Sequence, residues 1–159
     1  MQNHELLATY VAGPATLRSA VRDLTPEQAR ARPIPGQWST LEVVCHLADS
    51  EALFSERMKR VLCEDRPPLL WSDPTDQPRV LAYHERDLDE ELRLFELLRA
   101  QMTRILRAQP DDAWQRIGVH NKEGDRTLTD LVVKAVWHLE HHLKFIEAKR
   151  RALLGENTT

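Results

Sequence analysis

The stretch TLTDLVVKAVWHLEHHLKFI, residues 127–146, decides the fold that we expect for this chain of 159 residues. Thr127 can cap a helix and Asp130 is its third residue, so a capping box opens the segment. The following residues advance by three or four positions and share one stripe: Leu128, Leu131, Ala135, His138, His142 and Ile146. Basic residues at 149–151 complement the helix dipole, and Gly155 provides a stop. The pattern predicts a long helix whose inner face carries two histidines.

Three other segments show helical spacing of apolar residues, and hairpin signals of the Asn-Gly kind are absent. We expect one helix over Asn3–Asp23, kinked at Gly13-Pro14, and a short helix after Thr25. A capping box at residues 39–42 opens the next long helix, which continues to about Cys63. Another runs from about Val80 to Gln109. The expected fold is therefore all-α, a four-helix bundle forming a single domain over residues 1–159.

Two connections differ in composition from these helices. Four prolines, at positions 67, 68, 74 and 78, disfavour a regular helix and predict a long proline-rich connection between helices two and three. Such a connection could shape the entrance to a site. Residues 116–126 are polar and contain two glycines, which predicts a loop or small hairpin before the last helix.

Charge and composition disfavour several classes of protein. Acidic residues number 25 against 22 dispersed basic residues, so no basic patch for nucleic acid stands out. No signal peptide and no apolar run of membrane-spanning length is recognisable, so we expect a cytoplasmic protein that binds no membrane. Cys45 and Cys63 lie 18 positions apart on one expected helix, about 27 Å along its axis, and cannot form a disulfide. Two buried, reduced thiols are expected.

A metal site is the main functional hypothesis. His138 and His142 are four residues apart on one helix face, where two imidazoles can bind one cation. The spacing alone is weak evidence, because 7 histidines give about 0.3 such pairs by chance. However, two imidazoles on an apolar stripe have few partners except a cation. His46, on the inner face of the second helix, can supply a third ligand.

Neighbouring residues leave several alternatives open. Asp49 could be a fourth ligand, an outer partner that orients an imidazole, or a solvated residue. His141 projects away from His138 and could support the site or lie at the surface. His120, in the polar segment before the last helix, could reach the mouth of the site, although a structural role is the simpler reading. A zincin site is excluded because Leu139, not Glu, follows the first histidine.

Two motifs resemble the DinB/YfiT-like superfamily: PGQWS at residues 35–39 followed by HLADSE at 46–51, and WHLEHH at 137–142. GDRTL at 124–128 is similar to the turn that precedes the family's second metal-binding segment. The resemblance implies a four-helix bundle, often a homodimer, with zinc or nickel held by His46, His138 and His142. It also implies family branches that are transferases using a low-molecular-weight thiol such as bacillithiol or mycothiol. Cys45 and Phe145 depart from the family pattern, which leaves the substrate class open.

The leading hypothesis is a divalent-metal-dependent enzyme, a thiol-dependent S-transferase or a related hydrolase acting on a small-molecule electrophile. The alternative is a non-catalytic, metal-stabilised dimeric protein with a stress or binding role. The number of protein ligands on the metal distinguishes these two hypotheses. A closed shell of four protein ligands indicates a structural metal, and an open coordination position indicates a catalytic one.

Overall fold

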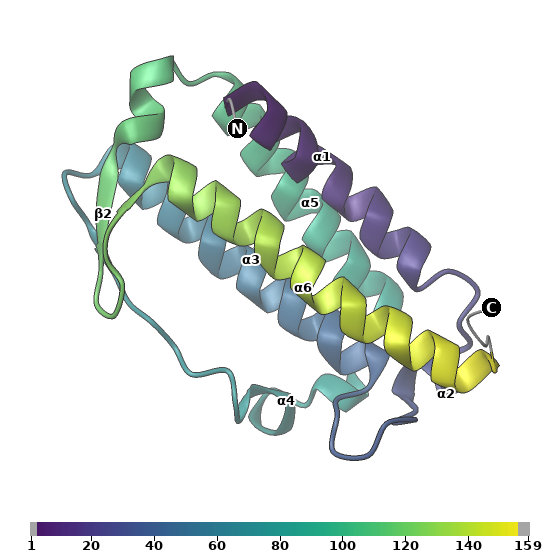
Figure 1. Cartoon of the computed structure of the whole chain (residues 1–159). Helices are drawn as coiled ribbons and strands as arrows, with labels where there is room; N and C mark the ends of the chain where they lie inside the picture. The colour runs from purple at the N-terminus through teal and green to yellow at the C-terminus, as the bar shows by residue number, and fades with distance from the viewer. Residues whose placement is uncertain (1–2, 156–159) are drawn as a thin grey trace.

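Four long helices form a bundle in the computed structural model, which describes residues 3–155 (Figure 1). They are α1 (Asn3–Ala20), α3 (Thr40–Cys63), α5 (Leu88–Arg107) and α6 (Leu128–Leu154). Both α1 and α3 pack against α5 and α6. Four apolar residues in the first half of α3 are buried in the core: Leu41, Val44, Leu47 and Ala48. Among residues 3–155, every helix is too short or too polar to span a lipid bilayer.

Capping boxes fix the starts of the helices, as the sequence predicts. The Ser39 hydroxyl accepts a hydrogen bond from the Glu42 amide, and the Glu42 carboxylate accepts one from the Ser39 amide. Thr127 and Asp130 make the same reciprocal pair at the start of α6. The short helix α2 (Pro26–Arg30) has a third capping box. Because these bonds satisfy amides that lack partners within the helix, they fix the residues at which α3 and α6 begin.

Helix α1 continues through Pro14, where the sequence predicts a kink, and ends at Ala20 rather than Asp23. Proline has no N–H, so the carbonyl of Tyr10 four residues earlier lacks its helical donor. Arg99 Nη1 on α5 donates to that carbonyl at 2.9 Å. A Cβ atom on Gly13 would lie 2.7 Å from the same Nη1, so the glycine makes room for the guanidinium. An arginine on a neighbouring helix thus replaces the missing hydrogen bond.

Arg99 is also the centre of a buried polar cluster. Its Nη2 donates to the Ala135 carbonyl on α6 at 2.9 Å, and its Nε lies 2.9 Å from Glu51 Oε2 on α3. The Tyr10 hydroxyl donates to the other oxygen of Glu51. Burial and the Glu51 charge raise the pKa of Tyr10 well above its ordinary range, so the hydroxyl keeps its proton. The cluster ties all four helices together through one side chain.

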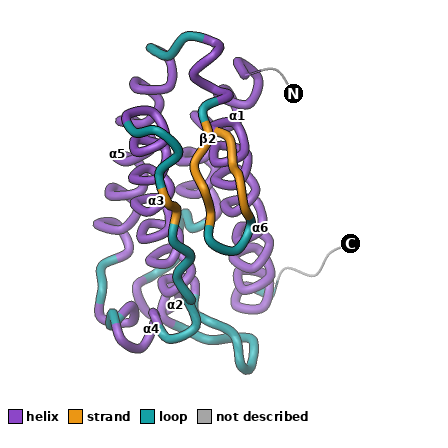
Figure 2. The backbone as a smooth tube through the Cα atoms, turned by 90° about the vertical axis from the view of Figure 1, so that its left-hand side faces the viewer, coloured by secondary structure: helices purple, strands orange, loops and turns teal. Residues whose placement is uncertain are grey.

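The all-α prediction is wrong in one respect, because three short strands form a sheet beside the bundle (Figure 2). Strands β2 (Ile117–His120) and β3 (Gly124–Thr127) pair antiparallel, which confirms the small hairpin expected before the last helix. Strand β1 (Pro68–Leu69) pairs parallel to β2. A Cβ atom on Gly118 would lie 2.7 Å from Leu69 Cδ1 and 2.9 Å from Val61 Cγ2 on α3. This glycine therefore lets β2 lie close to both.

Between α3 and α5 the chain forms β1, a short helix α4 (Gln77–Val80) and a 3-10 turn η1 (Tyr83–Glu85). The prediction that the third long helix begins near Val80 is wrong. Helix α5 begins at Leu88. Asp87 caps this helix, because its carboxylate accepts hydrogen bonds from the amides of Asp89 and Glu90. Ala82 has a φ of 49°, a left-handed conformation that ends α4 and separates it from η1.

Candidate metal centre

Three histidine side chains meet between α3 and α6. His46 comes from α3, and His138 and His142 come from successive turns of α6. Their ring centroids are 4.6 to 5.0 Å apart, and Nε2 of His46 lies 3.1 Å from Nε2 of His138. One possible ligand atom from each ring lies within 4.8 Å of the other two. Bonds of about 2.0 to 2.1 Å at angles of 90 to 109° place ligand nitrogens about 2.9 to 3.4 Å apart, so the cluster needs little closure to bind a cation.

Burial keeps all three rings neutral. His46 is 5% exposed, and the other two are partly buried. Burial is the main cause that lowers the pKa of His138, and together with the neighbouring His142 and His46 it brings this pKa to about 2. The pKa of His142 falls to about 3 for the same two reasons, and burial also lowers the pKa of His46. Neutral imidazoles offer lone pairs, so protons compete little for these nitrogens near neutral pH.

The cluster has the features of a site for a borderline divalent cation. The buried Nδ1 atoms of His46 and His142 have no hydrogen-bond partner within residues 3–155. Orphaned buried polar atoms of this kind are costly, and a cation bound at such a nitrogen removes that cost. Trp38 lies edge-on to His46 at 5.3 Å between centroids, and Phe54 lies edge-on to His138 at 5.5 Å. Three nitrogen donors in an aromatic surrounding fit zinc or a similar metal.

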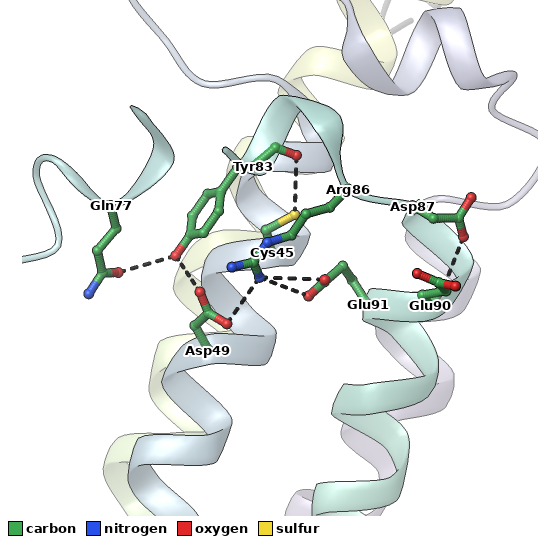
Figure 3. Close-up of polar contacts among 8 residues, drawn as sticks. All are labelled: Cys45, Asp49, Gln77, Tyr83, Arg86, Asp87, Glu90 and Glu91. Atoms are coloured by element: carbon green, nitrogen blue, oxygen red, sulfur yellow. Dashed lines mark hydrogen bonds and ion pairs between the residues drawn. The ribbon is translucent and has the colours of Figure 1, made fainter. Parts of the chain in front are cut away.

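Asp49 is held by residues of the connection between α3 and α5 (Figure 3). Its Oδ2 accepts a hydrogen bond from the Tyr83 hydroxyl at 2.8 Å, and its Oδ1 accepts one from Arg86 Nη1 at 3.1 Å. The Tyr83 hydroxyl also contacts Gln77 Oε1 at 3.2 Å. Asp49 lies outside the group of close ligand atoms, although the Gln77 amide and the Asp49 charge partly offset the lowering of the His46 pKa by burial. These contacts favour a role in supporting His46 over direct coordination.

Cys45 anchors the same connection without being a nucleophile. Its Sγ donates to the Tyr83 carbonyl at 3.6 Å, and burial raises the pKa of the thiol to about 12. The thiol therefore stays protonated. The expectation that both cysteines are buried is wrong for Cys63, which is exposed at the end of α3.

The other histidines named from the sequence have different surroundings. His141 stacks on Trp137, with centroids 5.0 Å apart and planes 16° from parallel, and does not join the three-histidine group. His120 is buried at the end of β2, where its Nδ1 accepts hydrogen bonds from the amides of Lys122 and Glu123. The first of these bonds is 3.2 Å long and the second 3.1 Å.

Sequence reasoning missed the residues that surround Asp49. Gln77, Tyr83 and Arg86 lie 28 or more positions after it in the chain, in a connection without helical periodicity. Only the path of that connection across α3 brings them to the site. Lys149 was also misread, because it belongs to a basic run yet is 2% exposed. Its Nζ donates to the Phe145 carbonyl at 3.3 Å, and burial lowers its pKa.

Comparison with known proteins agrees with this arrangement. The family model of the DinB superfamily matches residues 9–146. A relative from Bacillus subtilis, named "Putative metal-dependent hydrolase YfiT", is 31% identical over 140 residues, which are 87% of this chain and 79% of that protein. A Bacillus licheniformis protein, also named as a metal-dependent hydrolase of that kind, is 27% identical over 141 residues, 88% of this chain and 80% of the relative.

Solved structures show the same fold. YfiT from Bacillus subtilis, described as "a probable metal-dependent hydrolase with an unusual four-helix bundle topology", superposes with a TM-score of 0.88 at 27% identity. The match covers 96% of this chain and 87% of that one. A mycothiol-dependent maleylpyruvate isomerase superposes with a TM-score of 0.73 at 13% identity, over 91% of this chain and 60% of the other. The second likeness concerns the fold alone.

Proposed function

Because the chain belongs to the DinB superfamily, we propose that it is a metal-dependent enzyme whose divalent cation, zinc or nickel, is held by His46, His138 and His142. The observation that carries this proposal is the convergence of three neutral imidazoles from two helices. The metal-dependent relatives support it. A cation bound by three protein ligands retains an open position, where it can make water or a thiol nucleophilic near neutral pH.

We propose thiol transfer to a small electrophile as the reaction, with hydrolysis as the nearest variant. The group of close donor atoms in residues 3–155 contains no carboxylate, so the protein leaves the full charge of a divalent cation to be balanced by an anionic ligand. A thiolate provides that charge and attacks without a further base. Hydrolysis by a base-assisted route needs a nearby proton acceptor, and Asp49 is already bound to Tyr83 and Arg86.

The protein's own residues orient the site. The Gln77 side chain and the Asp49 charge act on His46 directly, and Tyr83 hydrogen-bonds to both of these residues. Trp38 packs edge-on against the His46 ring, and Phe54 packs edge-on against the His138 ring. Cys45 remains a buried thiol and takes no part in the reaction.

Metal analysis of tag-free protein tests the site. We expect about one divalent cation per chain in the wild type, and loss of most of it in His46→Ala, His138→Ala and His142→Ala. His84→Ala is the matched control, because His84 is exposed and lies outside the cluster. Equal metal content in all variants would refute the three-histidine site.

Cobalt substitution tests the reaction class. If the thiol occupies the metal, adding bacillithiol or mycothiol to the cobalt protein changes its visible spectrum, and an electrophile then consumes the thiol. A cobalt spectrum that responds to neither thiols nor electrophiles, together with full metal occupancy, would support the non-catalytic alternative.

A further inference from the structure

Arg57 is a buried guanidinium without a carboxylate partner. The residue is 7% exposed, and its one hydrogen bond within residues 3–155 goes from Nη2 to the Leu70 carbonyl. Its Nε is buried and has no acceptor. The two carboxylates whose charges act on Arg57 bind other cations: Glu56 pairs with Arg60 at 3.7 Å, and Glu123 pairs with Arg126 at 3.1 Å. A buried arginine is costly unless an anion neutralises it.

Arg57 lies on the same face of α3 as His46. Eleven residues separate them, which is three turns and about 16 Å along the helix. One turn before Arg57, the Phe54 ring lies 5.5 Å from the ring of His138. The His46 ring contacts His142 and the Phe54 ring contacts His138, so α3 and α6 run antiparallel here and Arg57 lies on the side of His138 away from His142.

Lys134 and His120 add two further donors at this end. Lys134 precedes His138 by one turn of α6, and its positive charge lowers the pKa of both His138 and His120. Its one ion pair among the described residues is long, 3.9 Å to Glu123. Three of the four charges that act on His120 are positive, those of Arg57, Arg126 and Lys134, and the fourth, that of Glu123, opposes them.

The tautomer of His120 is fixed by its backbone contacts. Its Nδ1 accepts hydrogen bonds from two amides, so this nitrogen carries no proton and the neutral ring carries one on Nε2. Within residues 3–155, Nε2 of this buried side chain donates to no acceptor. The His120 ring therefore presents a donor, and two amides hold it in place.

From these contacts we propose that Arg57, His120 and Lys134 form an anion subsite that binds a carboxylate group of the substrate. This inference rests on the proposed function, because it assigns a substrate class to the same site. The subsite lies about one to two helical turns, 5 to 11 Å, from His138. It selects electrophiles or thiols that carry a carboxylate at that distance from the reacting atom. A planar guanidinium with nearby N–H donors suits a carboxylate, and a phosphate is the competing oxyanion.

Side-chain NMR of 15N-labelled protein tests the subsite directly. We expect succinate at millimolar concentration and constant ionic strength to shift the Arg57 Nε–Hε and His120 ring signals, with chloride as the reference anion. Lys134→Gln should weaken this binding by about tenfold, because one charge-assisted contact is lost. Lys144→Gln, an equal charge change at an exposed position of the same helix, should leave it unchanged. Arg57→Gln should abolish it.

Two results would overturn the subsite. One is the absence of any succinate-dependent shift at Arg57 and His120, and the other is equal binding in Lys134→Gln and wild type. Lys134 is about half exposed, so its variant keeps the test valid even if Arg57→Gln fails to fold. A response to inorganic phosphate without one to succinate would contradict the carboxylate assignment. The succinate titration is repeated on chelator-treated protein and on His46→Ala, and succinate binding should persist in both. This repeat distinguishes failure of the metal site from failure of the subsite.

Discussion

Acidification should destabilise the metal-free protein through its histidine cluster. The pKa of His138 lies near 2 and that of His142 near 3 in the folded protein, against an ordinary value of 6.5. At a pH between 6.5 and the folded-state pKa of each histidine, the unfolded chain binds a proton at that ring and the folded protein does not. The free energy of unfolding therefore falls as the pH drops below about 6.5, and this loss continues down to the folded pKa values.

The magnitude follows from the two shifts. One proton changes the free energy of unfolding by about 1.36 kcal/mol per pH unit, so lowering the pH from about 7 to about 4.5 costs about 2.5 kcal/mol for each histidine. The two together cost about 5 kcal/mol, an upper value because both rings are partly exposed. A loss of this size is a large fraction of the stability of an ordinary domain.

Urea unfolding at a series of pH values, with chelator present, measures this dependence. His138→Gln should lose about half of the pH-dependent free energy, since it removes one of the two strongly shifted rings. The exposed control His84→Gln should keep the wild-type slope. Identical pH profiles for wild type and His138→Gln would refute the reasoning, because the remaining titration would then come from carboxylates.

Three further predictions concern other residues. Arg99→Leu should lower the free energy of unfolding by about 3 to 5 kcal/mol in urea titrations, because Glu51 would be left buried and unpaired; the double variant Arg99→Leu/Glu51→Gln should recover part of the loss. Ellman's reagent should modify the exposed Cys63 rapidly in the native protein and Cys45 only after unfolding, and two equally fast thiols would contradict the burial of Cys45. Tyr83→Phe removes a hydrogen bond to the carboxylate that supports His46, so competition with a chelator should show metal affinity about tenfold weaker, and an unchanged affinity would contradict that role.

Local signals explain which parts of the structure were predictable. The starts of α3 and α6 follow from capping boxes, in which each residue needs only a partner three positions away. The inward direction of His46, His138 and His142 follows from helical periodicity, so the sequence could bring these rings together once α3 and α6 were assumed to be neighbours.

Long-range contacts explain what was not predictable. Strand β1 is two residues long and is defined by its pairing with β2, so alternation in the sequence cannot reveal it. Pro14 looks like a helix breaker until Arg99, 85 positions later, is seen to bind the freed carbonyl. Tyr83 reaches Asp49 only through the path of the connection that carries it. Each of these contacts depends on where another part of the chain folds.

The approach of His46 to His138 also has a topological consequence. The two nitrogens are 3.1 Å apart in space but belong to residues 92 positions apart in the chain. A cation bound to both closes a loop of that length, as a covalent crosslink would. For a disulfide, the loss of chain entropy in the unfolded state corresponds to about 4 to 5 kcal/mol for a loop of this size. A cation that leaves on unfolding does not constrain the unfolded chain in this way; it stabilises the folded protein by its binding free energy instead, so the stability rises with the concentration of free metal.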